Sequence, residues 1–246
     1  MRAPILRATA AAVALSGVVL LSACSSGTDA ADAKPTTGQT APAKKENTAV
    51  ERTTLRQLNK LNDSAPSLKD STVVMVDYQN TYTRGVMELD GWEPALNEGA
   101  KLLAAARKAG APVIHIQNDA GEGSPYDTKA EIGKIHDKVA PAEGEPVITK
   151  TKAPNAFLDT GLAEELEKAG NKNVVIAGFM TNMCVQFTTA EAFLQGYQPT
   201  VVANASATRG VTTTTGKVSA EQMHQGALAT ITDLYGVVVP AVADLA

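Results

Sequence analysis

The sequence predicts an open α/β fold, in which a mainly parallel, six-stranded sheet is covered by helices on both faces. Along most of the chain, short apolar runs rich in β-branched residues alternate with amphipathic segments of helical spacing. Strands that are joined by crossover helices run parallel, so this alternation favours a parallel sheet. The 246 residues, 44% of them hydrophobic, are enough for one sizeable domain with its own core.

The first 23 residues are predicted to be a signal peptide. Arg2 and Arg7 flank the start of an apolar run that ends at residue 23, and small residues precede a cleavage point. The ending Leu21-Ser-Ala-Cys24 resembles the lipobox of bacterial lipoproteins. This resemblance implies cleavage before Cys24, lipidation of its thiol and an extracytoplasmic protein anchored to the cell membrane. The alternative is a plain secretory signal followed by an incidental cysteine.

Residues 24–65 are predicted to be a disordered tether. Ala, Thr, Pro, Lys and Gly dominate this segment as far as about Glu51, with almost no large apolar side chain. Such a segment cannot bury enough apolar surface to fold. Leucines at positions 55, 58 and 61 have the spacing of a short helix, which would lead into a folded domain at residues 66–246.

Within this domain, strands and helices are expected to alternate to the end. The expected strands are the apolar runs at residues 72–76, 112–116, 146–150, 173–178, 200–203 and 237–239. The expected helices lie at residues 94–108, 159–169, about 184–193 and 219–234. Pro94 and Gly110 mark the two ends of the first helix, and Gly170 closes the second. Ser219-Ala-Glu-Gln222 has the pattern of a capping box for the last helix.

One long segment carries no strong pattern. Residues 117–144 are polar and rich in Gly, Asp and Lys, with only a weak helical stretch near Ile132 and Ile135. A segment of this length in a compact domain is typical of binding loops or lids. We therefore expect it to select the substrate, although its sequence does not name one.

Three reactive or charged side chains follow predicted strands. Asp77, Lys150 and Cys184 come at the ends of the first, third and fourth strands. In an open α/β sheet, ligands bind beyond the carboxyl ends of the strands. Each residue alone has an ordinary explanation, as a capping aspartate, a solvated lysine or a buried cysteine. Together, a thiol, a carboxylate and an ammonium can act as nucleophile, base and electrostatic partner.

The position of Cys184 favours an activated thiol. It lies where the fourth strand passes into an amphipathic helix that carries Val185, Thr189, Ala192 and Phe193 on one face. Free backbone N–H groups and the helix dipole at such a junction make a thiol easier to ionise. We therefore expect a lowered pKa for this thiol.

Composition argues against several classes of partner. The net charge of −4, without a basic stripe, argues against nucleic acid. Two cysteines and three histidines show no zinc-site spacing, and no G-x-G-x-x-G or P-loop follows a strand. We therefore expect no metal and no nucleotide cofactor.

Four motifs carry a specific resemblance. In chain order they are Asp77-Tyr-Gln-Asn80, Glu145-Pro-Val-Ile-Thr-Lys150, Asn155-Ala-Phe157 and Gly178-Phe-Met-Thr-Asn-Met-Cys-Val185. From about residue 67 to residue 234, this arrangement resembles the isochorismatase-like cysteine hydrolases. The resemblance implies a Rossmann-like, six-stranded parallel sheet.

The same resemblance assigns roles to residues. It implies that Asp77, Lys150 and Cys184 are catalytic. It also implies a non-proline cis peptide at Phe179-Met180 that shapes an oxyanion hole formed by the backbone of Met180 and Cys184. The mechanism would be acyl transfer: Asp77 takes the thiol proton, Lys150 holds the negative charges, and Cys184 attacks a carbonyl.

Two features depart from the family pattern. In many relatives the lysine lies four residues before the Asn/Ser of the Asn155 motif, a position held here by Thr151. Lys150 is preferred over Lys152 because a strand end is fixed whereas a loop absorbs insertions. The Asp-x-His metal motif of nicotinamidase relatives is also missing, since His115 is followed by Ile-Gln-Asn-Asp119.

Further residues are expected around the site. A substrate pocket is predicted around Gln79, Tyr82, Phe157, Phe179 and Phe187, with Trp92 as a further wall residue. Ser206, Thr208 and Arg209 follow the fifth strand and either rim the site or cap a loop. His224 is expected to be structural.

Three hypotheses for the function remain. The first is a tethered hydrolase of small-molecule amides or related C–N bonds. The complete Asp/Lys/Cys set favours this hypothesis. The second is a catalytically inactive lipoprotein that binds small molecules on the same fold. The third is an interaction partner of other envelope proteins. The chain could also form a homo-oligomer.

Overall fold

The main sheet has six strands, and all neighbouring strands are parallel. The computed structural model describes residues 52–246, so Cys24, the signal peptide and most of the tether lie outside the described residues. The strand order is β3-β2-β1-β4-β5-β8. The strands are β1 (Ser71–Val76), β2 (Val113–Asn118), β3 (Val147–Lys150), β4 (Asn173–Phe179), β5 (Gln198–Ala207) and β8 (Val237–Val239). This architecture confirms the predicted fold class.

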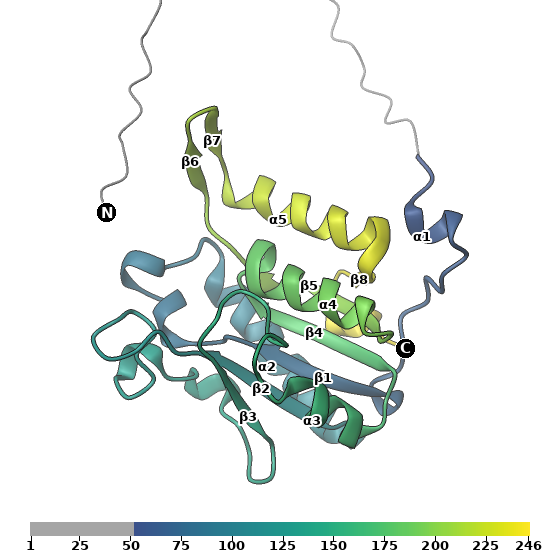
Figure 1. The fold of residues 1–246 in the computed structure, drawn as a ribbon, viewed down its shortest axis with the longest axis horizontal. Coiled ribbons are helices and arrows are strands. Elements are labelled where there is room, and N and C mark those ends of the chain that lie inside the picture. The colour runs from purple at the N-terminus through teal and green to yellow at the C-terminus, as the bar shows by residue number, and fades with distance from the viewer. Residues whose placement is uncertain (1–51) are drawn as a thin grey trace, which may run out of the picture. The chain divides into compact units, whose positions relative to one another are not determined.

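Helices cover the sheet on both faces. They are α2 (Trp92–Ala109) on one face and α3 (Leu162–Ala169), α4 (Gln186–Leu194) and α5 (Ala220–Thr230) on the other. In Figure 1, α2 lies behind the sheet, and the other three helices lie in front of it. Val73 and Met75 of β1 belong to the core beneath α2, whereas Val74 and Val76 belong to the core on the opposite face. Burial on both faces explains the continuous apolar runs.

Two helices begin elsewhere than predicted. Helix α2 begins at Trp92, after a left-handed Gly91 with φ 71°, so Pro94 is its third residue rather than its first. Proline is tolerated there because the first turn needs no intrahelical N–H bond. Helix α3 begins at Leu162 because Asp159, at φ 53°, is still in the preceding turn.

Strand β5 is longer than predicted, and a large bulge interrupts its pairing. Val201 pairs with Ile176 of β4, and the next pair is Ser206 with Gly178. Strand β8 pairs only with residues 200–202 of β5. The later part of β5 therefore has no main-sheet strand on its outer side.

A short hairpin follows β5 and was not predicted. Strands β6 (Val211–Thr213) and β7 (Gly216–Val218) form a separate antiparallel pair. Figure 1 shows this hairpin projecting beyond the helices, just before α5. Its residues 211–217 are exposed, so no apolar burial marks it in the sequence.

The long polar segment is held against the end of β1. The N–H of Asn80 donates to the carbonyl of Lys134, and the N–H of His136 donates to the carbonyl of Tyr78, at 2.9 and 2.8 Å. Ile135 forms a bridge with Gln79 between them. The expected weak helix near Ile132 is a single 3-10 turn, Glu131–Gly133.

The first described residues are also attached to the domain. The predicted short helix is α1 (Leu55–Leu58). Arg56 of this helix is buried, donates to the carbonyl of Leu234 at 3.2 Å and pairs with Asp63 at 2.9 Å. The described part of the predicted tether is therefore not a free linker. At the other terminus, the N–H of Ala246 donates to the carbonyl of Pro66 at 3.3 Å.

Tyr78 links the end of β1 to the bulge of β5. Its hydroxyl donates to the carbonyl of Ala205 at 2.5 Å, and its ring passes beneath Gly99 of α2. A Cβ atom at Gly99 would lie 2.5 Å from the Tyr78 hydroxyl, so only glycine fits there.

Within residues 52–246, no helix is long and apolar enough to cross a membrane.

Candidate active site

Three predicted side chains meet at the carboxyl ends of the strands. Nζ of Lys150 lies 2.7 Å from Oδ2 of Asp77 and 3.4 Å from Sγ of Cys184. Asp77 follows β1, Lys150 ends β3, and Cys184 lies in the turn after β4. The strand order reverses between β1 and β4, which is the place where ligands bind in open α/β sheets.

The backbone brings Asp77 and the turn after β4 close together. Asp77 has φ 48°, a left-handed conformation that turns the chain sharply at the end of β1. Gly178 of β4 has φ 143°, and a Cβ atom there would lie 1.9 Å from the carbonyl oxygen of Val76. Glycine at this position allows the two strand ends to approach each other.

Cys184 lies in a single π-helical turn, Thr181–Val185, that leads into α4. A cis peptide joins Phe179 to Met180 just before this turn, as the family resemblance implied. Two hydrogen bonds hold the turn: Thr181 Oγ1 lies 2.8 Å from Nδ1 of His224, and Thr208 donates to Asn182 at 2.5 Å. His224 thus has the structural contact that we expected.

The geometry separates the two candidate lysines. The side chain of Lys150 is 0% exposed and lies between the carboxylate and the thiol. Lys152 is 60% exposed and pairs with Asp159 on the surface. Only Thr151 separates the two residues, because the strand ends at Lys150, and the loop continues through a cis peptide at Ala153-Pro154.

The resting thiol is not activated in the way that the sequence suggested. Burial raises the pKa of Cys184 well above its ordinary value, and the charge of Asp77 raises it further. Lys150 acts in the opposite sense but does not compensate. The expectation of a lowered thiol pKa is therefore wrong: desolvation outweighs the helix start and the ammonium.

The two charged partners differ in their bonding. Burial alone would lower the pKa of Lys150, but Asp77 and Cys184 outweigh it, so this pKa lies above its ordinary value and the ammonium persists. Both side-chain oxygens of Asp77 are buried, and apart from the Lys150 ammonium, 2.7 Å from Oδ2, no group among the described residues makes a hydrogen bond to them. The charge of this carboxylate is therefore compensated chiefly by Lys150.

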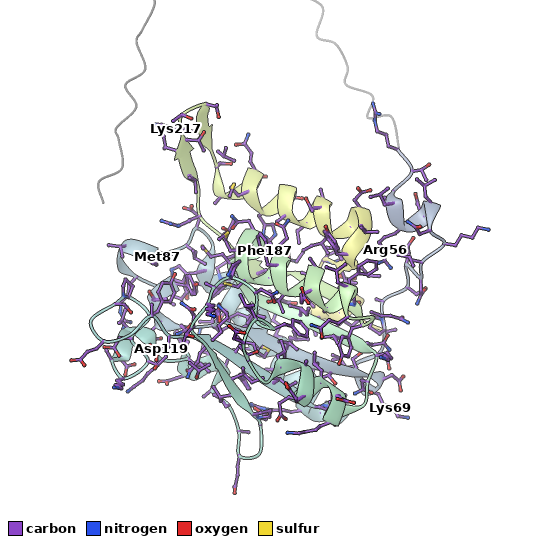
Figure 2. The ribbon with its side chains drawn as sticks, in the orientation of Figure 1. Arg56, Lys69, Met87, Asp119, Phe187 and Lys217 are labelled. Atoms are coloured by element: carbon purple, nitrogen blue, oxygen red, sulfur yellow. The ribbon has the colours of Figure 1, made fainter. Side chains whose placement is uncertain are left out.

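The predicted pocket residues fall into different environments. Phe179 is completely buried in the core, with its ring 4.8 Å from Tyr78 and 5.7 Å from Tyr82. Phe187 on α4, labelled in Figure 2, is 48% exposed. Phe157 is half-buried against the core beneath α3 and α4.

The side-chain amide of Gln79 makes its hydrogen bonds to backbone groups. Its Nε2 donates to the carbonyls of Asn118 and Gly133, and its Oε1 accepts from the N–H of Asn118 at 2.8 Å. It therefore ties the long segment and the end of β2 to the end of β1. This is a structural task rather than the substrate contact that we predicted.

A residue that sequence reasoning missed lies against Tyr82, one of the predicted pocket residues. Tyr126, on the long segment, stacks edge-on against Tyr82 at 5.8 Å. Burial raises the pKa of Tyr126 and the contact with Tyr82 lowers it, while the charges of Cys184, Asp77 and Arg209 also act on it. Tyr126 is thus a neighbour of Tyr82, and only the length of the segment hinted at its role.

Comparison with known proteins identifies relatives of this chain. A model of the isochorismatase domain matches residues 71–242. The secreted isochorismatase effector Isc1 of Verticillium dahliae is 34% identical over 177 residues, which are 72% of this chain and 90% of that protein. The ureidoacrylate amidohydrolase RutB of Methylobacterium radiotolerans is 28% identical over 200 residues, covering 67% of this chain and 74% of RutB.

A solved structure extends the agreement to the fold. The crystal structure of an isochorismatase from Pseudomonas putida KT2440 superposes with a TM-score of 0.76 at 34% identity, covering 80% of this chain and all of that one. The open α/β fold and the hydrolases among these relatives define the class of protein: this chain is a hydrolase. It belongs to the isochorismatase family.

Proposed function

We propose that the chain is a cysteine-dependent amidohydrolase, which cleaves a small-molecule amide or a related C–N bond through Asp77, Lys150 and Cys184. The observation that carries this proposal is the buried lysine. Its Nζ contacts both the carboxylate, at 2.7 Å, and the thiol, at 3.4 Å, with no exposure to solvent. A purely structural ion pair has no need of a thiol beside it. An amidohydrolase among the relatives supports the same reaction class.

The acylation half of the proposed reaction begins with a neutral thiol. Asp77 takes the proton from Sγ of Cys184 as the sulfur attacks the substrate carbonyl carbon. The Lys150 ammonium stabilises the sulfur while it carries negative charge. The carbonyl oxygen becomes an oxyanion that accepts hydrogen bonds from the backbone N–H groups of Met180 and Cys184. The protonated Asp77 then gives its proton to the leaving nitrogen, the C–N bond breaks, and the acyl-enzyme remains.

The second half restores the free enzyme. A water molecule attacks the thioester carbonyl and gives one proton to Asp77. The tetrahedral intermediate collapses, the C–S bond breaks, and the sulfur takes that proton back from Asp77. One water is consumed, and one acid and one amine, or ammonia, leave. The raised pKa of Cys184 makes the thiolate a good base for this last step.

The substrate is expected to carry a negative charge or a strongly polar group away from the scissile bond. Arg209 is half-exposed, follows Thr208, which bonds to Asn182 of the nucleophile turn, and forms no ion pair with another residue of the range 52–246. Tyr82 and Tyr126 would provide an aromatic wall with polar tips. This composition favours a small amide, ureide or carbamoyl compound over a large apolar ester.

Substrate screening and trapping test this function. The full chain is incubated with panels of amides, ureides and carbamoyl compounds, and release of amine or ammonia is measured. Cys184→Ala should abolish turnover, and Arg209→Gln should raise KM for anionic members with little change for neutral ones. Intact-mass analysis of quenched reactions should show an adduct on Cys184. Turnover that survives Cys184→Ala would reject the mechanism.

We also propose that the hydrolase is exported and anchored through a lipid on Cys24. The support is the lipobox-like ending and the apolar run before it. Cys24→Ala should abolish labelling with a radioactive fatty acid and leave uncleaved precursor or soluble protein. Unchanged membrane retention of that variant would contradict the anchor.

A further inference from the structure

A cavity opens at the amino ends of the strands, on the side of the sheet away from the catalytic groups. The cavity beside Arg56, as we call it, has a volume of about 190 Å³. The first residues of three strands contribute to its lining, namely Asn173 of β4, Gln198 of β5 and Val237 of β8. The three catalytic side chains lie beyond the opposite ends of the strands, so this cavity is no part of the candidate active site.

The walls of this cavity are mainly apolar, and its two aromatic rings are held in place. The ring of Phe193 packs edge-on against Tyr235, with 6.0 Å between the centroids. Nζ of Lys172 lies 5.2 Å from the centroid of the Tyr197 ring, a cation–π contact. The remaining apolar residues of the lining are Leu61, Pro66, Pro199 and Val237. Two of these precede β1, so the segment that enters the domain closes the cavity over the sheet.

One charged side chain lines the cavity. Arg56, labelled in Figure 2, is 7% exposed, and no carboxylate is part of the lining within residues 52–246. A guanidinium has five N–H groups. Those of Arg56 donate to Oδ1 of Asp63 at 2.9 Å, to the carbonyl of Leu234 at 3.2 Å and to the carbonyl of Asn62. Two N–H groups therefore make no hydrogen bond to the described part of the chain.

The partner of this arginine faces away from the cavity. The side chain of Asp63 is 54% exposed, and Asp63 is not part of the lining. Its charge is therefore screened by solvent, whereas the guanidinium is buried. A buried donor without a partner favours an acceptor, and a carboxylate gives the strongest hydrogen bond to a guanidinium.

From these observations we propose that the cavity beside Arg56 is a second binding site, which takes a carboxylate attached to a single aromatic ring, such as benzoate. A dry apolar cavity of about 150 Å³ takes up benzene. The 190 Å³ of this cavity thus hold one ring and a small polar group, but not a second ring. The ring lies against Phe193 and Tyr197, and the carboxylate accepts hydrogen bonds from Arg56.

Bound carboxylate would join two parts of the chain. Residues 56, 61, 62, 64 and 66 line one side of the cavity, and residues 196–200 line the other. A ligand that contacts both sides stabilises the segment before β1 against local opening. Binding at this site requires no turnover, so it can be measured separately from hydrolysis.

Calorimetry and hydrogen exchange on the full chain locate the ligand. Benzoate should bind one to one, and it should slow amide exchange in residues 56–66 and 196–199 but not in Thr181–Val185. Benzyl alcohol, which keeps the ring, and acetate, which keeps the carboxylate, should each bind at least about 10-fold more weakly. Absence of benzoate binding, or slowed exchange in Thr181–Val185 alone, would overturn the proposal.

Four variants separate the roles of the residues, and each is first shown by thermal melting to be folded. Val237→Phe fills the cavity from β8 and should abolish benzoate binding while leaving turnover unchanged. Arg56→Met should weaken benzoate at least about 10-fold but leave benzyl alcohol nearly unchanged. Arg84→Met, at an exposed arginine outside the lining, is the matched control and should leave benzoate binding unchanged.

The fourth variant tests for binding at the catalytic side. Arg209→Gln should also leave benzoate binding unchanged, and saturating benzoate should not alter the rate at which iodoacetamide labels Cys184. Benzoate binding that survives Val237→Phe, or that is lost in Arg209→Gln, would place the ligand elsewhere and reject the site.

Discussion

Replacing Lys150 by methionine is the most informative single change. It distinguishes between the two candidate lysines, and it measures the free energy lost when the buried ion pair with Asp77 is broken. Methionine keeps most of the volume and removes the charge. Both Lys150 and Asp77 are 0% exposed and lie 2.7 Å apart. Breaking such a pair leaves a buried carboxylate without a counter-ion, at a cost of about 3–5 kcal/mol. Lys152→Met breaks an exposed pair instead, which contributes about 0–1 kcal/mol.

Urea unfolding at pH 7 measures these costs, and hydrolysis of the best substrate measures activity. Lys150→Met should lose about 3–5 kcal/mol of unfolding free energy and at least about 100-fold in kcat/KM, as expected when a preorganised charge is removed. Lys152→Met should resemble the unmodified chain in both measurements.

A second variant distinguishes a folding defect from a chemical one. In the double variant of Lys150→Met with Asp77→Asn, neither charge is buried, so much of the lost stability should return. Activity should not return, because the base is gone as well. A stable and active Lys150→Met would refute our account of the site, and an inactive Lys152→Met would move the assignment to that lysine.

Three further predictions concern pH, thiol reactivity and packing. Glu145 has a pKa of about 2, below its ordinary value of 4.5, chiefly because Arg107 donates hydrogen bonds to its carboxylate. Its ion pair therefore stabilises the protein above pH 4.5 and is lost as the pH falls from 4.5 towards 2. Since that arginine is 39% exposed, Glu145→Gln should cost only about 1–2 kcal/mol in urea melts at pH 7 and nothing near pH 2. Iodoacetamide should label Cys184 more slowly than free cysteine at pH 7, and the labelling rate should increase as the pH rises. A labelling rate that is already maximal at pH 7 would contradict the raised thiol pKa. Gly99→Ala should destabilise by about 1–3 kcal/mol through its clash with Tyr78, whereas the control Gly226→Ala, on an open stretch of α5, should be neutral or stabilising in thermal melts.

The motif residues were predictable because each follows a strand. Asp77, Lys150 and Cys184 were placed from the ends of three apolar runs, and the structure brings their side chains together. The choice of Lys150 followed from the same logic, since the end of β3 is fixed by its pairing: Lys150 is its last residue and pairs with Asn118 of β2. Roles that depend on position along a strand could therefore be inferred without a structure.

Properties that depend on surroundings could not be inferred in that way. The pKa of Cys184 is set by burial among groups distant in sequence, and this burial reversed the expected direction. Phe179 belongs to the same motif as Cys184, yet its side chain lies in the core, because the side chains of β4 alternate between two buried faces. Tyr126 belongs to a segment without periodicity, so only the folded chain shows its contact with Tyr82.

The last residue, Ala246, lies beside Pro66, on the side of the sheet remote from the catalytic groups. Ala246 bonds to Pro66, and the cavity beside Arg56 is lined by the first residues of β4, β5 and β8, whereas the three reactive side chains lie beyond the opposite strand ends. A tag, a fluorescent protein or a resin joined at the C-terminus would therefore lie on the opposite side of the sheet from Cys184. The short distance between Pro66 and Ala246 also makes residues 66–246 a suitable starting point for circular permutation, with new ends placed in an exposed loop.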